Sequence, residues 1–363
     1  MRSDGIVYDI HYGDVIIKFG SILDMGNEDV PYIANGKEGK TPAQLQDGDI
    51  VIADTAEDET AGKAVEIYNA KRKRIEAGLH TIPCRPISAY APMYLGYYMN
   101  SAFYHSQLLS LLQGVKVLSI SKANISKTVI TSPQSKIEQE KISSVLYLID
   151  LKVKKQRQVI DTLKKYKRGL LSNLFGEKIT QGCTTKSYYF SEIAQRRSEK
   201  YNPTSGIEYP CVELENIEQE TGKILSTVPS TAQSSIKNIA MSGDTLFGKL
   251  RPYLRKYAFA QKTMACSSEI WALIPSDVVL PKFLFYLVQT EQFLRVANIS
   301  SGTKMPRAEW SNIEKAEFFI PDFSVQHKVV SLLEGLDQKI TFADSALFSL
   351  NRLKASLLQH LFI

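Results

Sequence analysis

The sequence has few cysteines and no long apolar run. The most apolar stretch, Val278–Val288, is shorter than the ~20 residues of a membrane span and contains Pro281 and Lys282. The N-terminal residues have no apolar core, so we expect neither a signal peptide nor a membrane partner. The four cysteines form no CxxC pair, which argues against a zinc knot or a secreted disulfide scaffold and predicts a cytoplasmic protein: Cys84, Cys183, Cys211 and Cys266.

Motifs for catalysis and for cofactor binding are also missing. The sequence contains no GxGxxG for a dinucleotide or a methyl donor, no GxSxG, and no pair of histidines at metal-ligand spacing. Ala34–Thr41 approaches a phosphate-binding loop, but Ala34 stands where that loop has glycine and Pro42 interrupts the helix that should follow. An enzyme using this loop is a rival hypothesis. We predict that the chain itself holds no catalytic residue, metal or cofactor.

The positive charge is concentrated in one stretch. The chain has 44 basic and 38 acidic residues, a net charge of +6. Residues 136–178 hold eleven basic and five acidic residues, so this stretch carries the whole excess. A basic helix near a polyanion is one interpretation, and a solvated helix face is the other. Charge alone leaves both open.

A long internal repeat organises the chain. Residues 139–175 align without a gap onto residues 326–362, and twelve of the 37 aligned positions are identical. Upstream, Gly114–Val117 matches Gly302–Met305, and the echo Gly48-Asp49 matches Gly243-Asp244. The period is too long for a solenoid. We infer a tandem duplication in which each copy is a globular region followed by a long helix.

Both repeated segments have apolar residues spaced alternately by three and four. This narrow seam predicts a coiled coil, and an antiparallel pair within the chain gives each helix its partner. Lys167 and Lys354 occupy the same seam position, where they fix the register or mark an exposed end. We predict that the helix interface is formed by Ile142, Leu146, Ile149, Ile160, Leu163, Leu170, Leu174, Leu333, Leu336, Leu347, Leu350, Leu357 and Leu361.

The globular regions are predicted to be mixed α/β. One helix is expected in each, over Met93–Gln113 and Lys282–Ala297, introduced by Pro92 and Pro281. We divide the chain into domains at 1–135 and 179–322 and helices at 136–178 and 323–363. Strands are expected at Val15–Phe19, Ile50–Ala53, Ala64–Tyr68, Tyr209–Leu214, Thr245–Leu250, Tyr257–Ala260 and Glu269–Ile274.

Cations alternate with aromatic residues in the second copy, between Phe247 and Tyr257. Such a run can contact DNA phosphates or base edges, although the wet face of an edge strand has the same pattern. A second run, Gly302–Arg307, and its first-copy partner add further cations, whereas Lys71–Arg74 suits a solvated turn equally well. The predicted DNA-binding residues are Lys249, Arg251, Tyr253, Arg255, Lys256, Lys304, Arg307 and Lys116.

The duplicated plan, with Gly243-Asp244-x-x-Phe247-Gly-Lys-x-Arg-Pro-Tyr253 and Gly302-Thr-Lys-Met-Pro-Arg307 in the second copy, resembles the specificity subunit of type I restriction–modification systems. That resemblance implies two target-recognition domains, each reading half of a bipartite site in double-stranded DNA. It implies that the paired helices space the domains and dock two methyltransferase subunits, with motor–nuclease subunits joining for restriction. The methyl donor, ATP and Mg²⁺ would then bind to those partners.

One departure from the family concerns the first domain. Copy two opens with Ser187–Ala194, the opening that family domains usually carry, and copy one has no equivalent. We expect the first domain to lack this opening strand. A rival of another class is a stand-alone DNA-binding regulator that dimerises through coiled coils. It predicts specific DNA binding without a methyltransferase.

Overall fold

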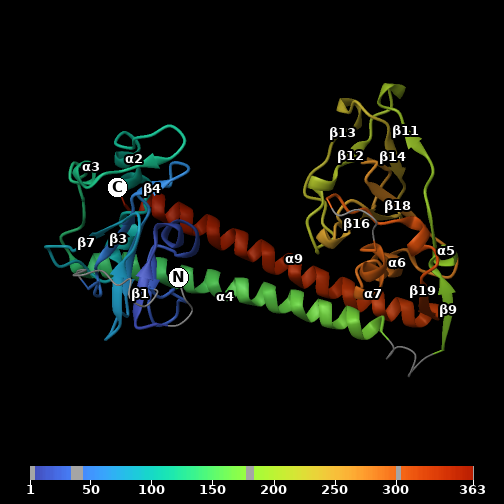
Figure 1. Cartoon of the computed structure of the whole chain (residues 1–363). Helices are drawn as coiled ribbons and strands as arrows, with labels where there is room; N and C mark the ends of the chain where they lie inside the picture. Colours follow the sequence, from blue (N-terminus) through green and yellow to red (C-terminus); the bar gives the residue numbers. More distant parts are fainter. Residues whose placement is uncertain (1–4, 34–43, 177–183, 300–303, 363) are drawn as a thin grey trace. The chain divides into compact units, whose positions relative to one another are not determined.

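The computed structural model describes residues 5–33, 44–176, 184–299 and 304–362. The loop at Ala34–Thr41 therefore lies outside the described residues. The chain divides into two compact units, one formed by residues 1–158 and 344–363, the other by residues 159–343. Two long helices, α4 (Lys136–Leu174) and α9 (Phe323–His360), each contribute to both units (Figure 1). No described helix is long and apolar enough to cross a membrane.

The first unit is a mixed α/β structure. Its main sheet has the strand order β2-β5-β3-β7, with two small sheets, β1-β6 and β4-β8. One face packs on α1 and α2, where Tyr94 and Tyr97 are fully buried. The elements are β1 (Val7–Ile10), η1 (Asp14–Lys18), β2 (Ile22–Asp24), β3 (Ile50–Ala53), β4 (Thr55–Ala56), β5 (Ala64–Tyr68), β6 (Arg74–Ala77), β7 (Thr81–Cys84), α1 (Tyr94–Tyr98), α2 (Ala102–Leu109), β8 (Leu118–Ser119) and α3 (Lys122–Ile125).

The second unit is also mixed α/β. Its two larger sheets have the orders β10-β18-β15-β16 and β11-β14-β17-β12-β13, and β19 pairs with β9. Its largest core surrounds α6 and α7. The elements are β9 (Thr185–Tyr189), α5 (Phe190–Ile193), β10 (Ala194–Arg196), β11 (Lys200–Tyr201), η3 (Pro203–Ser205), β12 (Pro210–Val212), η4 (Leu214–Asn216), β13 (Val228–Pro229), η5 (Ser230–Ala232), β14 (Lys237–Ala240), β15 (Thr245–Gly248), η6 (Pro252–Leu254), β16 (Tyr257–Phe259), β17 (Met264–Cys266), β18 (Ile270–Pro275), α6 (Pro281–Leu287), α7 (Glu291–Ala297), α8 (Trp310–Ile313) and β19 (Glu317–Pro321).

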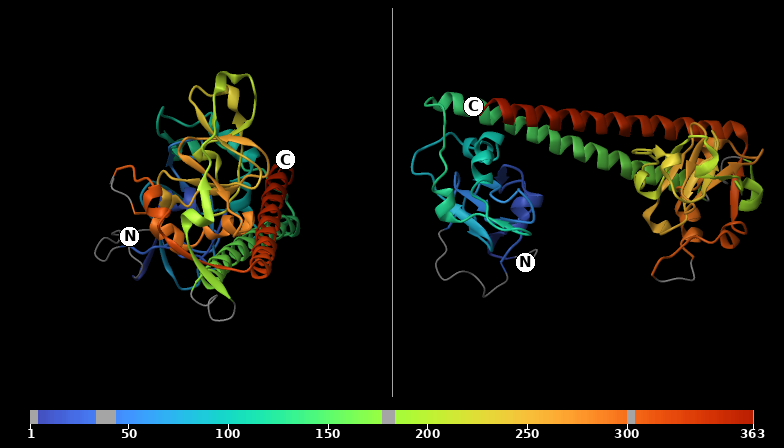
Figure 2. Two further views of the ribbon diagram at one scale, coloured as in Figure 1. Left: turned by 90° about the vertical axis from the view of Figure 1, so that its right-hand side faces the viewer. Right: turned by 90° about the horizontal axis from the view of Figure 1, so that it is seen from above.

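The helices α4 and α9 lie side by side and run in opposite directions within each unit (Figure 2). In the first unit Leu146 shares a core with Phe362, and Asp150 pairs with Lys354. Residues further along α4 therefore meet residues earlier in α9, as in an antiparallel pair. In the second unit Lys167 pairs with Asp337, and Leu171 shares a core with Val329. The antiparallel direction predicted from the two seams is the direction found in each unit.

The two shorter predicted helices are each broken in two. The expected helix over Met93–Gln113 divides into α1 and α2, and the one over Lys282–Ala297 divides into α6 and α7. Ser101 and Thr290 cause the breaks, because each has extended backbone and its hydroxyl accepts a hydrogen bond from the N–H three residues later. Predicting one helix in each copy was wrong, and the copies are broken at matching positions.

The expected strand at Val15–Phe19 is also wrong. Residues Asp14–Lys18 form η1, a π-helical turn that buries Val15 and leaves Ile17 exposed. A short apolar run does not distinguish a strand from a buried turn. The expected strands Ile50–Ala53 and Ala64–Tyr68 are β3 and β5, and those at Thr245–Leu250 and Tyr257–Ala260 are longer than β15 and β16.

The weak echo Gly48-Asp49 and Gly243-Asp244 marks the same turn in both units. Both glycines have positive φ, 84° and 97°, and each buried aspartate accepts a hydrogen bond from the backbone N–H three residues earlier. Each aspartate also binds an arginine with two hydrogen bonds. The two arginines come from different elements, since Arg85 follows β7 and Arg197 follows β10.

The opening strand is where the two units differ. In the second unit β9 pairs with β19 over five residues. In the first unit β1 pairs in parallel with β6, and its Tyr8 forms an antiparallel bridge to Tyr32. In the second unit β12 has the same two kinds of partner, since it pairs in parallel with β17 and antiparallel with β13. By these pairings β1 corresponds to β12. Residues 129–133 occupy the repeat position of β19 just before the long helix. No strand in the described part of the first unit pairs with them.

Candidate nucleic-acid interface and helix anchors

The two predicted DNA-binding runs of the second unit lie next to each other. The segment from Lys249 to Lys256 joins β15 to β16, and the N–H of Arg251 donates to the carbonyl of Pro306 at 2.8 Å. The N–H of Ala308 donates to the carbonyl of Lys249 at the same distance. The backbone thus brings together residues separated by more than 50 positions. Residues 300–303, with the start of the second run, lie outside the described residues.

Several predicted DNA-binding side chains are engaged within the protein. The Arg255 guanidinium lies between Glu291, at 2.8 Å, and Glu220, at 3.6 Å. Arg307 forms two hydrogen bonds to Glu269, which raise the pKa of its guanidinium. The Lys256 ammonium donates to the carbonyl of Leu214 at 2.6 Å. DNA contact through these three cations would first require breaking such bonds.

The other predicted DNA-binding side chains are more accessible. Arg251, Tyr253 and Lys304 are exposed, and Lys249 lines a hollow of the second unit. Arg251 has a φ of 51°, which is uncommon for a residue other than glycine. In the first unit Lys116 is exposed in the tight turn that joins Gln113 to its bridge partner Ser119.

The thirteen predicted interface residues of the long helices are all buried or half-buried. Leu146, Ile149, Ile160, Leu333 and Leu336 are buried, and the other eight are half-buried. Helix burial here includes packing on the globular parts, because Leu146 and Leu333 belong to the cores beside α1 and α6. The seam therefore also attaches the globular parts to the helices.

The two seam lysines form the centre of a contact found in both units. The Lys354 ammonium binds Asp150 at 2.5 Å, the hydroxyl of Tyr97 donates to the same carboxylate at 2.8 Å, and the ammonium lies 5.7 Å from the Tyr97 ring centre. The corresponding values for Lys167, Asp337 and Tyr286 are 2.7, 2.9 and 5.4 Å. Burial lowers the pKa of Lys167, and the neighbouring Asp337 opposes this shift.

A glutamine near the start of each long helix makes a second repeated contact. Gln139 accepts a hydrogen bond from the N–H of Ala91 at 2.9 Å and donates to the carbonyl of Pro133 at 2.8 Å. Gln326 accepts from the N–H of Leu280 at 2.8 Å and donates to the carbonyl of Pro321 at 2.9 Å. Each glutamine thereby ties the start of its helix to the chain that precedes α1 or α6.

A phenylalanine near the end of each helix makes the third repeated contact. The Phe362 ring lies 5.7 Å from that of Tyr94, and the Phe175 ring lies 4.8 Å from that of Phe283. We call each set a helix anchor. The first anchor comprises Tyr97, Gln139, Asp150, Lys354 and Phe362, and the second comprises Phe175, Lys167, Tyr286, Gln326 and Asp337. Each anchor uses both long helices.

Most of the residues that match a known domain family lie in the second unit. Residues 190–347 match the family of the type I restriction modification DNA specificity domain. The chain is 27% identical over 175 residues to the type I restriction enzyme HindI specificity subunit of Haemophilus influenzae, a match that covers 43% of this chain and 36% of the relative. It is 27% identical over 186 residues to the EcoDI specificity subunit of Escherichia coli, covering 48% and 40%. The chain thus spans about two fifths of the length of these curated relatives.

Solved structures share the fold over nearly the whole chain. A chain from a study of complex assembly and conformational transition of the type I R-M system has a TM-score of 0.62 at 13% identity, covering 98% of this chain and 90% of that chain. The type I restriction-modification S subunit from M. genitalium has a TM-score of 0.54 at 15% identity, covering 94% and 88%. The resemblance predicted from the sequence is confirmed, and residues 190–347 carry the match to the type I restriction modification DNA specificity domain.

Proposed function

We propose that this chain is the DNA sequence-recognition subunit of a type I restriction–modification complex. In this proposal each globular domain reads one half of a bipartite site in double-stranded DNA. The repeated helix anchors carry the proposal, because the same side-chain contacts join each unit to the long helices while the remaining parts of the units differ. Two different globular domains attached in the same way to one helix pair suit a DNA site whose two halves differ in sequence.

The long helices would set the unread gap between the half-sites. Their 39 and 38 residues correspond to a length of ~55–60 Å at 1.5 Å per residue. Because B-DNA rises ~3.4 Å per base pair, this length is of the order of one and a half turns of DNA. Gap length would then depend on the number of helix residues.

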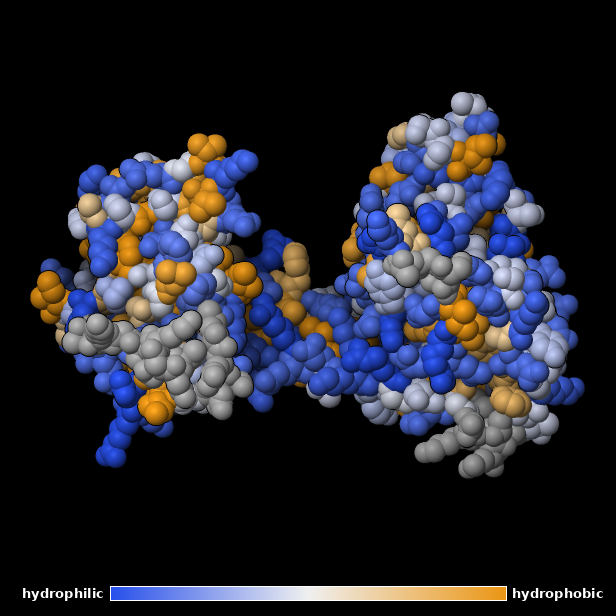
Figure 3. Space-filling model, viewed as in Figure 1, coloured by the Kyte–Doolittle hydropathy of each residue, from blue (hydrophilic) through white to orange (hydrophobic). Residues whose placement is uncertain are grey.

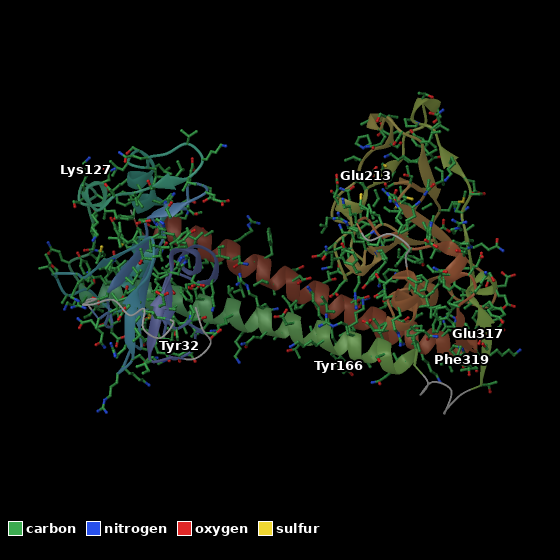
Figure 4. The ribbon with its side chains drawn as sticks, in the orientation of Figure 1. Tyr32, Lys127, Tyr166, Glu213, Glu317 and Phe319 are labelled. Atoms are coloured by element: carbon green, nitrogen blue, oxygen red, sulfur yellow. The ribbon has the colours of Figure 1, made fainter. Side chains whose placement is uncertain are left out.

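The helices would also dock two methyltransferase subunits. Outside the seam each helix exposes apolar side chains. Val145 of α4 and Leu332 of α9 occupy the same repeat position, and so do Tyr166 and Leu353. We call these residues the outer stripe: Ile137, Val145, Leu148, Val159 and Tyr166 of α4, and Leu332, Phe342 and Leu353 of α9. Tyr166 is labelled beside α4 in Figure 4, and Figure 3 shows apolar residues between the polar ones along the helices.

Catalysis in this proposal belongs to the partners. The methyltransferase subunits would bind the methyl donor, and the motor–nuclease subunits would bind ATP and Mg²⁺, while this chain is non-catalytic. Because the substrate is genomic DNA, the proposal places the complex in the cytoplasm.

A base-resolution map of methylated adenines in the host genome, with and without this gene, tests the proposal. We expect deletion to remove methylation from a two-part motif with a fixed gap. Unchanged methylation, in a strain whose chain co-purifies with its methyltransferase, would contradict it. Specific DNA binding by the chain alone, without any methyltransferase dependence, would favour a stand-alone regulator.

A further inference from the structure

A hollow in the second unit has a strongly basic lining. Its volume is about 570 Å³, and its lining residues come from α5, β10, β11, β14, β18 and α8, and from the segments that follow β10, β15 and β17. Four cations line it, namely Arg196, Arg197, Lys200 and Lys249, and none of the described lining residues is acidic. Such a hollow suits a ligand that is negatively charged or rich in hydrogen-bond acceptors.

The four cations differ in how they are held. Arg197 binds the buried Asp244 through two hydrogen bonds, at 2.6 and 3.0 Å, so its role is structural. The Lys200 ammonium donates to Asn238 at 2.5 Å, and Asn238 in turn donates to the carbonyl of Ile270 at 2.8 Å. This chain of hydrogen bonds holds the charge of Lys200 at the wall of the hollow.

Arg196 is supported by aromatic rings. Its guanidinium carbon lies 4.9 Å from the ring centre of Trp310 and 5.8 Å from that of Trp271. The two indole rings lie 5.7 Å apart and are nearly perpendicular, at 85°, so they form a corner beneath the exposed arginine. A guanidinium that stacks on a ring uses its face for the contact, while its N–H groups point outward in the guanidinium plane. These N–H groups stay available to donate to two acceptors that lie in one plane.

The paired acceptors most often met by such an arginine in DNA are O6 and N7 of guanine. We infer that Arg196 is a specificity-determining residue of the second unit and reads a guanine in one half-site. Lys200 and Lys249, on the walls beside it, contact the flanking phosphates. This inference rests on the proposed function and adds to it the residue and the base.

The test uses the complete methyltransferase complex containing this chain with Arg196→Lys. Lysine keeps the charge but lacks the planar fork, so discrimination against the other bases at one guanine position should fall by about 10- to 100-fold. Methylated-adenine mapping on a genomic library should show this change in one half-site only. Arg295→Lys, at another exposed arginine of the same unit, is the matched control and should leave both half-sites unchanged.

Three results would overturn the inference. An unchanged motif would exclude Arg196 as a reader, and relaxation of both half-sites would exclude a role confined to one unit. Equal weakening on all sequences would make Arg196 a phosphate contact only. The failure of the proposed function is separate, because the wild-type complex would then show no two-part motif at all.

Discussion

Each seam lysine places a charge where a coiled coil normally has an apolar residue. The Lys167 side chain is only 7% exposed and Lys354 is 20% exposed, so neither ammonium can rely on water. Asp337 and Asp150 compensate this loss of hydration, and the tyrosine hydroxyls satisfy the remaining oxygen of each carboxylate. A shift of the helices by one residue would separate both pairs, so we expect the lysines to specify register.

We expect Lys167→Met to destabilise the protein by about 2 kcal/mol, because it leaves the Asp337 carboxylate without its cation in a partly buried site. Lys354→Met should cost less, since its side chain is more exposed. Urea unfolding followed by circular dichroism measures both. Lys152→Met and Lys339→Met, at exposed positions that are also related by the repeat, are the matched controls. Equal effects for all four variants would contradict a register role.

Glu66 is a buried carboxyl group in the first unit. It accepts hydrogen bonds from the N–H groups of Met93, at 2.6 Å, and Gly96, at 2.8 Å, but burial is the larger effect and raises its pKa from 4.5 to about 7. The folded protein therefore keeps this proton at a pH where the unfolded chain has released it. The free energy of unfolding should fall as pH rises from 4.5 to 7 and stay level above 7.

Glu66→Gln removes this titration. The stability difference between wild type and variant should therefore shrink, by at most about 3 kcal/mol, as pH rises from 4.5 to 7. Because the Gln amide cannot accept both N–H groups, the variant starts less stable. Urea unfolding at several pH values provides the measurement, and a difference that does not vary with pH would show that Glu66 does not titrate in this range.

At the scale of elements, periodicity over a long segment was the most reliable guide. The two long helices begin at Lys136 and Phe323, where the helix segments were predicted, and every predicted seam residue is buried or half-buried. The domain division itself stays a prediction. Shorter elements were less predictable, because the hydroxyls of Ser101 and Thr290 end one helix and begin another without disturbing the apolar pattern around them.

A test of the spacer inserts seven residues into α4 and seven into α9, midway along each helix, so that the heptad phase is kept. The helix pair lengthens by ~10 Å, and the preferred gap should grow by ~3 base pairs. Mapping of methylated sites in the genome reads the gap directly. An insertion of the same length after Gly206, in a turn of the second unit with φ of 77°, should leave the gap unchanged. A gap that ignores the helix insertion would contradict the spacer role.

At the scale of the whole chain, the outer stripe predicts the composition of the complex. Val145 lies in the first unit and Leu332 in the second, at matching repeat positions. Val145→Glu should remove one methyltransferase subunit and Leu332→Glu the other, because each buries a charge in an apolar contact. The double variant should bind none.

Native mass spectrometry of the co-expressed complex measures this stoichiometry. Val129→Glu and Ile236→Glu, at exposed apolar residues outside the two long helices, are the controls and should keep two methyltransferase subunits. Retention of both subunits by the double variant would exclude the outer stripe as the docking surface.

The side-chain partners of the candidate DNA-binding residues were harder to predict than the scaffold. A run of cations between aromatics led to Arg255 and Lys256, but the carboxylates that bind Arg255 lie at Glu220 and Glu291, far away in the sequence. Arg196 stands beside no aromatic residue in the sequence, and its supports, Trp271 and Trp310, come from β18 and α8. Such pairings depend on tertiary structure, and a single sequence carries no local signal for them.

The two helix anchors also make the units exchangeable in principle. The first anchor takes Gln139 and Asp150 from α4, Lys354 from α9 and Phe362 from just after α9. The second takes the same four residue types with the two helices exchanged. A DNA-reading domain would therefore fit either anchor if it supplies a tyrosine for the lysine–aspartate pair and a helix with an aromatic residue for the phenylalanine. Recombination between genes, with crossovers inside the long helices, would give a folded protein with a new target. New specificities could then arise by exchange of whole modules, without stepwise change of individual bases read.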